Sequence, residues 1–191
     1  MSRMIDKYKI IHALQIGARE VVVGVSPEQE FMCSFCTQDG VREYYTEAMA
    51  SDDYLEIMEL YTDRLKRQIA AVQAQRKALH IPLDMLAPEQ CFPLHDSDDI
   101  TGKVVAVKPS VLRYEYRRAD CQLILVTNGS GAQGYPRGTS VFGINVFTGR
   151  RDSRWVRTDI LGEVRPECLP QWVKDRLPSI EREQALEREG R

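Results

Sequence analysis

Apolar residues recur every seven positions over residues 51–79, which is the most regular stretch of the chain. Such spacing is typical of one face of a helix, and Asp53 followed by Glu56 offers an N-terminal cap. We therefore predict a long helix here. Its repeating positions are Met58, Leu65, Val72 and Leu79, flanked by Leu55, Tyr61 and Ile69.

The apolar stripe on this helix has two interpretations. It packs the helix against a sheet of the same lobe, or it joins two copies of the chain in a coiled coil through residues 54–79. Thr62 and Arg76 lie within the stripe, which spans only about three and a half heptads. Packing within the lobe is therefore favoured over a homodimer.

The first residues of the chain also show helical spacing. Ile5, Tyr8 and Ile11 lie three residues apart within residues 4–16. Gly17 follows and is a typical helix stop. We therefore predict a short first helix over residues 4–16.

The stretch between the two helices changes to a period typical of strands. Two β-prone runs, residues 20–25 and 30–37, are separated by the turn-forming segment SPEQ. They predict a β-hairpin. Residues 41–50 fit either a third strand or the approach to the long helix.

Prolines interrupt the pattern after the long helix, three of them within residues 81–100. Such a cluster marks a loop or a connection between lobes. We therefore divide the chain into an acidic lobe of hairpin and helices, a proline-rich connection and a basic β-module with C-terminal helices. These three parts span residues 1–80, 81–100 and 101–191.

The last part of the chain has the period of strands, with Gly or Pro between the runs. Residues 169–177 predict a short closing helix, and residues 179–190 a charged tail helix. The predicted fold is α+β: an N-terminal β-hairpin plus a long helix, then a small antiparallel β-sheet or barrel closed by a short helix. The predicted strands of that sheet are residues 103–107, 121–127, 139–147 and 154–158.

A G-x-G-x-x-G motif at Gly129, Gly131 and Gly134 follows an apolar run. A dinucleotide site would require a helix directly after the third glycine. Pro136 and Gly138 disfavour that helix, and the residues after them favour a strand. We interpret the motif as a glycine-rich hairpin loop, in which glycines supply positive φ or close backbone approach.

Composition limits the class of protein. The chain has 191 residues, of which 43% are hydrophobic, enough to fill a core. Its five cysteines are an odd number, which favours reduced thiols over a disulfide framework. We find no membrane-spanning run and no signal peptide, so the sequence predicts a cytoplasmic protein.

Charge is divided unevenly along the chain. Residues 1–102 carry 10 Lys and Arg against 17 Asp and Glu, whereas residues 103–157 carry 10 against 3, a net charge of +7. Arginines mixed with aromatic rings suit phosphate backbones and unstacked bases, but the same surface also suits the chain's own acidic half or an acidic protein. The candidate binding residues are Arg113, Arg117, Arg118, Tyr135, Arg137, Arg150, Arg151, Arg154, Trp155 and Arg157.

A zinc site is a weaker hypothesis. Cys33 and Cys36 have C-x-x-C spacing, and Cys91 with His95 supplies two further ligands. In an extended strand, however, the first two thiols point to opposite faces and do not share a metal. Buried structural thiols are the favoured interpretation, and we expect no cofactor. No nucleophile motif accompanies the three histidines, which argues against an enzyme.

Three stretches carry a resemblance: SDDYLEIMELY, LRYEYR and the glycine loop with its continuation through R-W-V-R-T-D-I-L-G to P-E-C-L-P-Q-W. The chain resembles uncharacterised accessory proteins of conjugative elements, plasmids and prophages of Gram-positive gut bacteria. That resemblance supplies no catalytic residue. It implies a setting in which small proteins bind DNA, conjugation machinery or a host defence nuclease.

The expected function is therefore non-enzymatic binding, through the basic β-module, to nucleic acid or to a nucleoprotein such as a defence nuclease. Inhibition of such a nuclease, in the manner of anti-restriction or anti-CRISPR proteins, is one form of this function. The alternative is a homo-oligomeric scaffold that uses the long helix. A lesser alternative is a zinc-containing or thiol-dependent enzyme.

Overall fold

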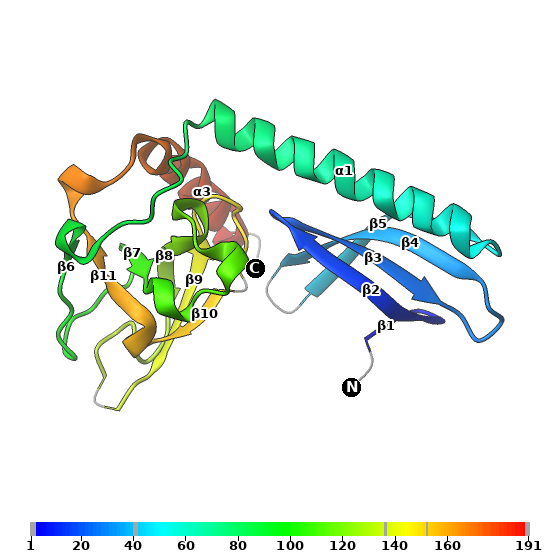
Figure 1. Cartoon of the computed structure of the whole chain (residues 1–191). Helices are drawn as coiled ribbons and strands as arrows, with labels where there is room; N and C mark the ends of the chain where they lie inside the picture. Colours follow the sequence, from blue (N-terminus) through cyan, green and yellow to red (C-terminus); the bar gives the residue numbers. More distant parts are fainter. Residues whose placement is uncertain (1–2, 40–41, 136, 152, 190–191) are drawn as a thin grey trace. The chain divides into compact units, whose positions relative to one another are not determined.

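The computed structural model describes residues 3–39, 42–135, 137–151 and 153–189 and has an α+β fold. The chain divides into two compact units, which we call the first unit (Met1–Ala78) and the second unit (Leu79–Arg191). Each unit has its own antiparallel sheet (Figure 1). The two are described separately below.

The first unit contains a five-stranded sheet in the order β1-β2-β3-β4-β5. The predicted hairpin is confirmed as β3 and β4, which pair from Arg19↔Thr37 to Val25↔Phe31. For residues 42–50 of the predicted segment 41–50, the strand is the correct alternative, and residue 41 lies outside the described residues. The strands are β1 (Met4–Ile5), β2 (Tyr8–Ile16), β3 (Arg19–Val25), β4 (Phe31–Asp39) and β5 (Arg42–Ser51).

The predicted first helix is wrong, because residues 4–16 form β1 and β2. β2 pairs with β3 along its length, from Lys9↔Val25 to Ile16↔Arg19. Gly17 ends the strand by turning with φ +63°, and a side chain there would clash with the helix residue Val72. The segment contains four isoleucines and one tyrosine, whose β propensity, combined with a long pairing partner, outweighs an accidental helical spacing.

The predicted long helix is confirmed as α1 (Tyr54–Ala78). The Asp53 carboxylate caps its start by accepting a hydrogen bond from the Leu55 N–H at 2.8 Å. The helix lies along one face of the five-stranded sheet (Figure 1). Its apolar stripe packs on that face, with Ile57 buried against Val21, Val23, Cys33 and Phe35, and with Met58 and Leu65 beside them. The centre of the stripe is thus covered within its own unit, whereas the flanking Leu55 and Ile69 are 70% and 43% exposed.

The second unit contains a six-stranded sheet in the order β10-β9-β8-β7-β11-β6. The four predicted strands are confirmed as β7, β8, β9 and β10, and the sheet has two additional strands that we did not predict. The described residues show no pairing between the edge strands β10 and β6, so the sheet is open. The strands are β6 (Cys91–Phe92), β7 (Val104–Val107), β8 (Leu123–Asn128), β9 (Ser140–Asn145), β10 (Ser153–Val156) and β11 (Ile160–Val164).

Residues 81–100, which we predicted to be a connection, pack on this sheet. They supply β6, which pairs with β11. The Leu86 N–H donates to the buried Gln122 Oε1 at 2.7 Å, and Ile100 is fully buried in the core. Short helical turns connect the remaining elements: η1 (Pro88–Gln90), η2 (Pro109–Val111), η3 (Tyr114–Tyr116), α2 (Ala119–Gln122), η4 (Arg157–Asp159) and η5 (Pro166–Cys168).

The two helices predicted after residue 168 form one helix, α3 (Gln171–Glu189). Pro178 lies inside it and removes one backbone hydrogen bond without ending the helix. The start of α3 packs against the residues that follow β9. The Trp172 ring lies edge-on to the Phe147 ring, with the two ring centroids 6.4 Å apart. Arg176 donates to the Phe147 carbonyl at 3.1 Å.

Candidate functional site

The glycine loop joins β8 to β9, which pair antiparallel. The hairpin interpretation is therefore confirmed, and no helix follows Gly134 as a dinucleotide site would require. Gly129 has φ +124°, and a Cβ there would lie 2.2 Å from the Ser140 carbonyl oxygen. The loop is thus folded against its own second half, at a distance that only glycine permits.

Hydrogen bonds from Arg157 connect this loop to the chain before β7. Its Nη1 donates to the Gly131 carbonyl at 2.5 Å and its Nη2 to the His95 carbonyl at 2.6 Å. The backbone N–H of Arg157 donates to the Thr139 carbonyl at 2.7 Å. Arg157 therefore links three segments: the glycine loop at Gly131 and Thr139, the chain before β7 at His95, and the end of β10.

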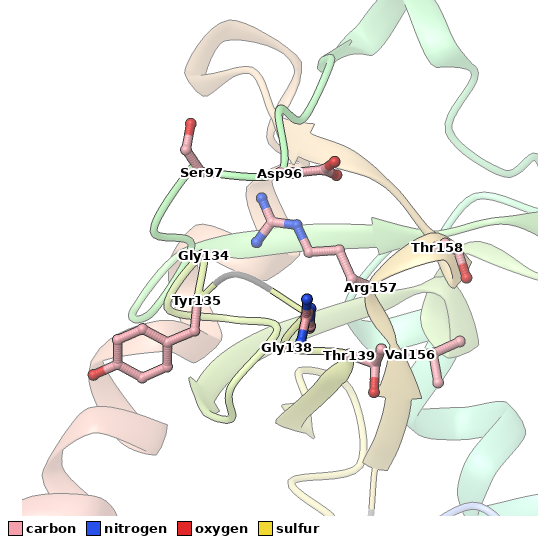
Figure 2. Close-up of a pocket in the computed structure, with 10 residues that line it drawn as sticks. Asp96, Ser97, Gly134, Tyr135, Gly138, Thr139, Val156, Arg157 and Thr158 are labelled. Carbon is pink, nitrogen blue, oxygen red and sulfur yellow. The ribbon is translucent and has the colours of Figure 1, made fainter.

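An open cavity of about 450 Å³ lies where these three segments meet (Figure 2). Two of its lining residues are arginines, one is an acid and four carry hydroxyl groups. Figure 2 shows the Arg157 guanidinium directed toward residues 96–97, and the Tyr135 ring pointing outward from the loop. The lining residues are Asp96, Ser97, Gly134, Tyr135, Arg137, Gly138, Thr139, Val156, Arg157 and Thr158.

Several candidate binding residues have structural contacts. Trp155 packs against the hydrophobic core of the second unit, and Arg157 holds the cavity wall as described above. Arg118 forms a 3.3 Å ion pair with Asp120, which is buried. Arg150 and Arg151 are half-buried in the turn that joins β9 to β10.

The other candidates lie on the surface, several of them beside aromatic rings. Tyr114 is 85% exposed, and the Arg117 guanidinium lies 5.1 Å from its ring centroid. Arg113, on the same turn, is exposed and forms a 3.3 Å ion pair with Glu115. Arg137 and Tyr135 are exposed on the glycine loop, where Arg137 has φ 66°.

A second exposed ring pairs with arginine on the sheet. Phe142 of β9 is 37% exposed and lies directly across from Arg154 of β10 in the register. The Arg154 guanidinium lies 5.9 Å from the Phe142 ring centroid. Sequence reasoning missed Phe142, because only the strand register shows that it shares a surface with Arg154. It also missed Asp96, Ser97, Thr139 and Thr158 of the cavity, which carry no motif.

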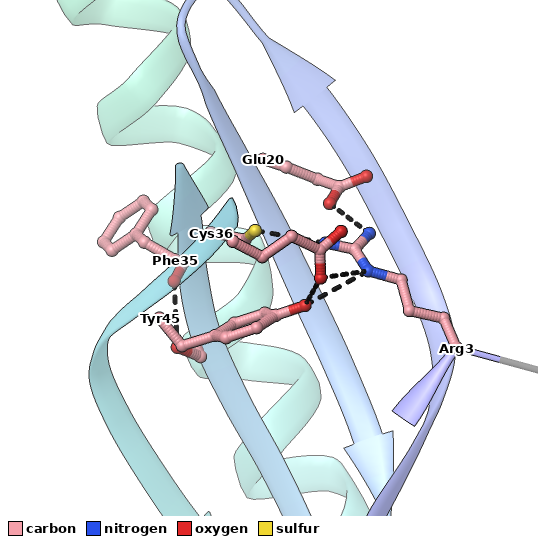
Figure 3. A network of polar contacts seen from close by, with 7 residues as sticks. Arg3, Glu20, Phe35, Cys36 and Tyr45 are labelled. Carbon is pink, nitrogen blue, oxygen red and sulfur yellow. Dashed lines mark hydrogen bonds and ion pairs between the residues drawn. The ribbon is translucent and has the colours of Figure 1, made fainter. Parts of the chain in front are cut away.

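The first unit carries a polar cluster around Arg3 (Figure 3). Arg3 contacts Glu20 at 2.5 Å and Glu43 at 3.1 Å, and it donates to the Tyr45 hydroxyl and to the Cys36 Sγ. Burial acts to lower the pKa of Arg3, but the hydrogen bonds to Glu20 and Tyr45 outweigh it and raise the pKa. Arg3 is thus a fixed cation that links β3, β4 and β5 from the start of the chain.

The proposed zinc ligands do not form a cluster. Cys33 faces α1, whereas Cys36 lies on the opposite face of β4 beside Arg3. Cys91 is buried on β6, and His95 is exposed in the following turn. Burial raises the pKa of Cys33, Cys36 and Cys91, which keeps these thiols protonated. Across the described residues, no three His, Cys, Asp or Glu side chains gather as a metal site.

Comparison of the chain with known family models, curated proteins and solved structures finds no match in any of the three. Among the helices of the described residues, none combines the length and the apolar character that crossing a membrane requires. The function is therefore inferred from the surface of the second unit itself.

Proposed function

We propose that the protein is a non-enzymatic binding protein whose second unit binds single-stranded nucleic acid. The observation that supports this proposal is the pairing of exposed aromatic rings with arginines, Tyr114 with Arg117 and Phe142 with Arg154. Exposed rings offer stacking faces to bases, and the neighbouring guanidinium groups attract phosphates.

The surrounding charge supports the same function. Residues 103–157 carry a net charge of +7, and the exposed Arg113 and Arg137 add cations beyond the two ring pairs. Stacking on an aromatic ring contributes about 1–3 kcal/mol per base and tolerates any base sequence. We therefore expect weak sequence preference and strong dependence on salt.

The resemblance to accessory proteins of mobile elements supports a setting in which the nucleic acid belongs to such an element or to a complex that attacks it. Binding to a nucleoprotein, including inhibition of a defence nuclease, would use the same stacking and phosphate-binding groups. A nuclease that requires single-stranded substrate would then be the first class to test.

The test is fluorescence anisotropy with labelled oligo-dT, duplex DNA and RNA across a salt series. Tyr114→Ala and Phe142→Ala should each weaken single-strand binding by about tenfold, corresponding to one lost stacking contact. Tyr44→Ala is the matched control, because Tyr44 is a half-exposed tyrosine of the first unit. Equal loss in the control variant, or no salt-dependent binding at all, would refute the proposal.

A second candidate function is self-association through α1. Leu55 is 70% exposed and borders a shallow hollow on the helix with Met58 and Thr62. An exposed leucine beside a hollow suits a helix from a second copy. Sedimentation of the wild type and of Leu55→Glu at micromolar concentration tests this. A wild-type monomer would exclude it.

A further inference from the structure

The walls of the cavity beside the glycine loop are held in position by hydrogen bonds and by a close backbone contact. Arg157 is held by two carbonyls, and Ile100 N–H donates to the Ala132 carbonyl at 2.8 Å, which fixes the loop to the chain before β7. Gly134 has φ +66°, and a Cβ at this position would lie 2.5 Å from the Ser97 carbonyl oxygen. The wall therefore depends on a close backbone contact, and a ligand would meet donors that are already positioned.

The donors in this cavity suit a phosphate group. A guanidinium has five N–H donors, and the described residues accept two of those of Arg157, at Gly131 and His95. Arg137 also lines the cavity and is exposed. Ser97, Thr139 and Thr158 add exposed hydroxyls, and serine, threonine and arginine are among the side chains that contact phosphate oxygens in nucleic-acid complexes.

The acidic residues around the cavity limit its charge without reversing it. Asp96 is the one acid among the lining residues, against two arginines. The neighbouring acids cap their own turns: the Asp98, Asp99 and Asp159 carboxylates accept backbone N–H groups of His95, Thr101 and Val156. Asp96 has no such bond among the described residues, so its charge acts on whatever enters the cavity.

We infer that the cavity holds the phosphate of one nucleotide, gripped by Arg137 and Arg157. This assignment rests on the proposed function, because it makes the cavity one phosphate position of the nucleic-acid surface. Its volume of about 450 Å³ matches the size of small-ligand sites. Val156 offers apolar surface for the sugar, and the outward ring of Tyr135 offers a stacking face for a base at the rim (Figure 2).

The probes are dTMP and thymidine, which differ only in the phosphate. NMR titration of the full chain should show that dTMP shifts the amide signals of Gly134, Gly138, Thr139 and Thr158. Thymidine at the same concentration should leave them unchanged. Equal shifts with thymidine would overturn the assignment, because the phosphate would then contribute nothing.

Three variants sharpen the test. Arg137→Gln keeps a side chain of similar length on the same backbone and should weaken dTMP binding about tenfold by removing a charge-assisted contact. Asp96→Asn should tighten it by about two- to fivefold, because it removes a repulsive charge. Arg182→Gln is the control, since Arg182 is an exposed arginine of α3 that does not line the cavity, and its effect should stay within about twofold. Unchanged affinity in Arg137→Gln would refute the assignment.

The two proposals fail in different ways. If oligo-dT binds in a salt-dependent manner while dTMP leaves the cavity amides unchanged, the proposed function stands and the cavity assignment is wrong. If dTMP shifts those amides but oligo-dT binds no more tightly than dTMP, the cavity assignment stands and the extended nucleic-acid surface is wrong.

Discussion

Arg64 of α1 is a buried cation on which the first unit depends. It is 2% exposed and lies 5.2 Å from the centroid of the Phe35 ring. Its Nη1 donates to the Cys33 carbonyl at 2.9 Å, and its Nη2 donates to the Glu47 carbonyl. These carbonyls flank the irregularity at which the register of β4 and β5 shifts, where Glu47 has φ 54°. We expect Arg64 to stabilise this bulge.

Arg64→Met removes both donors and keeps an apolar side chain in the space. Hydrogen bonds to a charged group contribute about 1.5–3 kcal/mol each, so the two together contribute about 3–6 kcal/mol. Loss of the guanidinium recovers part of the free energy that burying a charge costs. We therefore expect the free energy of unfolding of the first unit to fall by about 2–4 kcal/mol.

Urea unfolding separates the two units, because both tryptophans, Trp155 and Trp172, belong to the second unit. Far-UV circular dichroism reports both sheets, whereas tryptophan fluorescence reports the second unit. Arg64→Met should shift the dichroism transition of the first unit by about 1 M or more. The fluorescence transition should not move. Arg67→Met is the matched control, since Arg67 is an exposed arginine on the same helix. Unchanged or increased stability in Arg64→Met would refute the stabilising role.

Three further predictions follow from burial and charge. In the native protein, thiol reagents should first modify the half-buried Cys121 and Cys168. Mass spectrometry should find the buried Cys33, Cys36 and Cys91 modified only in urea. Gly134→Ala should destabilise the second unit by about 1–3 kcal/mol, measured by its fluorescence transition, because of its positive φ and contact with Ser97. Hydrogen bonds from Lys7 and Tyr8 lower the pKa of Glu30, so its stabilisation is complete above the unfolded-state pKa of about 4.3. That stabilisation is lost as the pH falls through the lower folded-state pKa, and pH-dependent urea midpoints of Lys7→Met should show a smaller acid loss.

The elements that could be predicted from the sequence are those whose local pattern agrees with their tertiary partners. The long helix has both a repeating stripe and a cap at Asp53, and the sheet covers the centre of that stripe. The segments that form β7 to β10 have the period of strands, and glycine or proline separates one segment from the next. The predicted helix over residues 4–16 is wrong because pairing with β3 decides the structure of this segment. That pairing is not visible in the spacing of Ile5, Tyr8 and Ile11.

The candidate site could be predicted only in part, for a similar reason. The glycine loop and its exposed tip follow from the G-x-G-x-x-G segment and the strand-forming residues after it. The cavity does not, because it needs Asp96 and Ser97, which lie more than 30 residues earlier in the chain. Phe142 also carries no signal in the sequence, since its position beside Arg154 follows from the register of β9 and β10.

The basic segment, residues 103–157, therefore contains arginines with two roles, and its net charge alone does not separate them. Arg118 offsets a buried aspartate and Arg157 satisfies two backbone carbonyls, so both stabilise the second unit even without a ligand. Arg113, Arg137 and Arg154 are exposed, and removing one of their charges has little effect on such a surface unless a partner binds there. Substitution of the exposed set should consequently change binding without changing the urea midpoint, whereas Arg157→Gln should lower both. A charge reversal of all arginines in this segment would mix the two effects, which is why single substitutions at exposed positions are the informative ones.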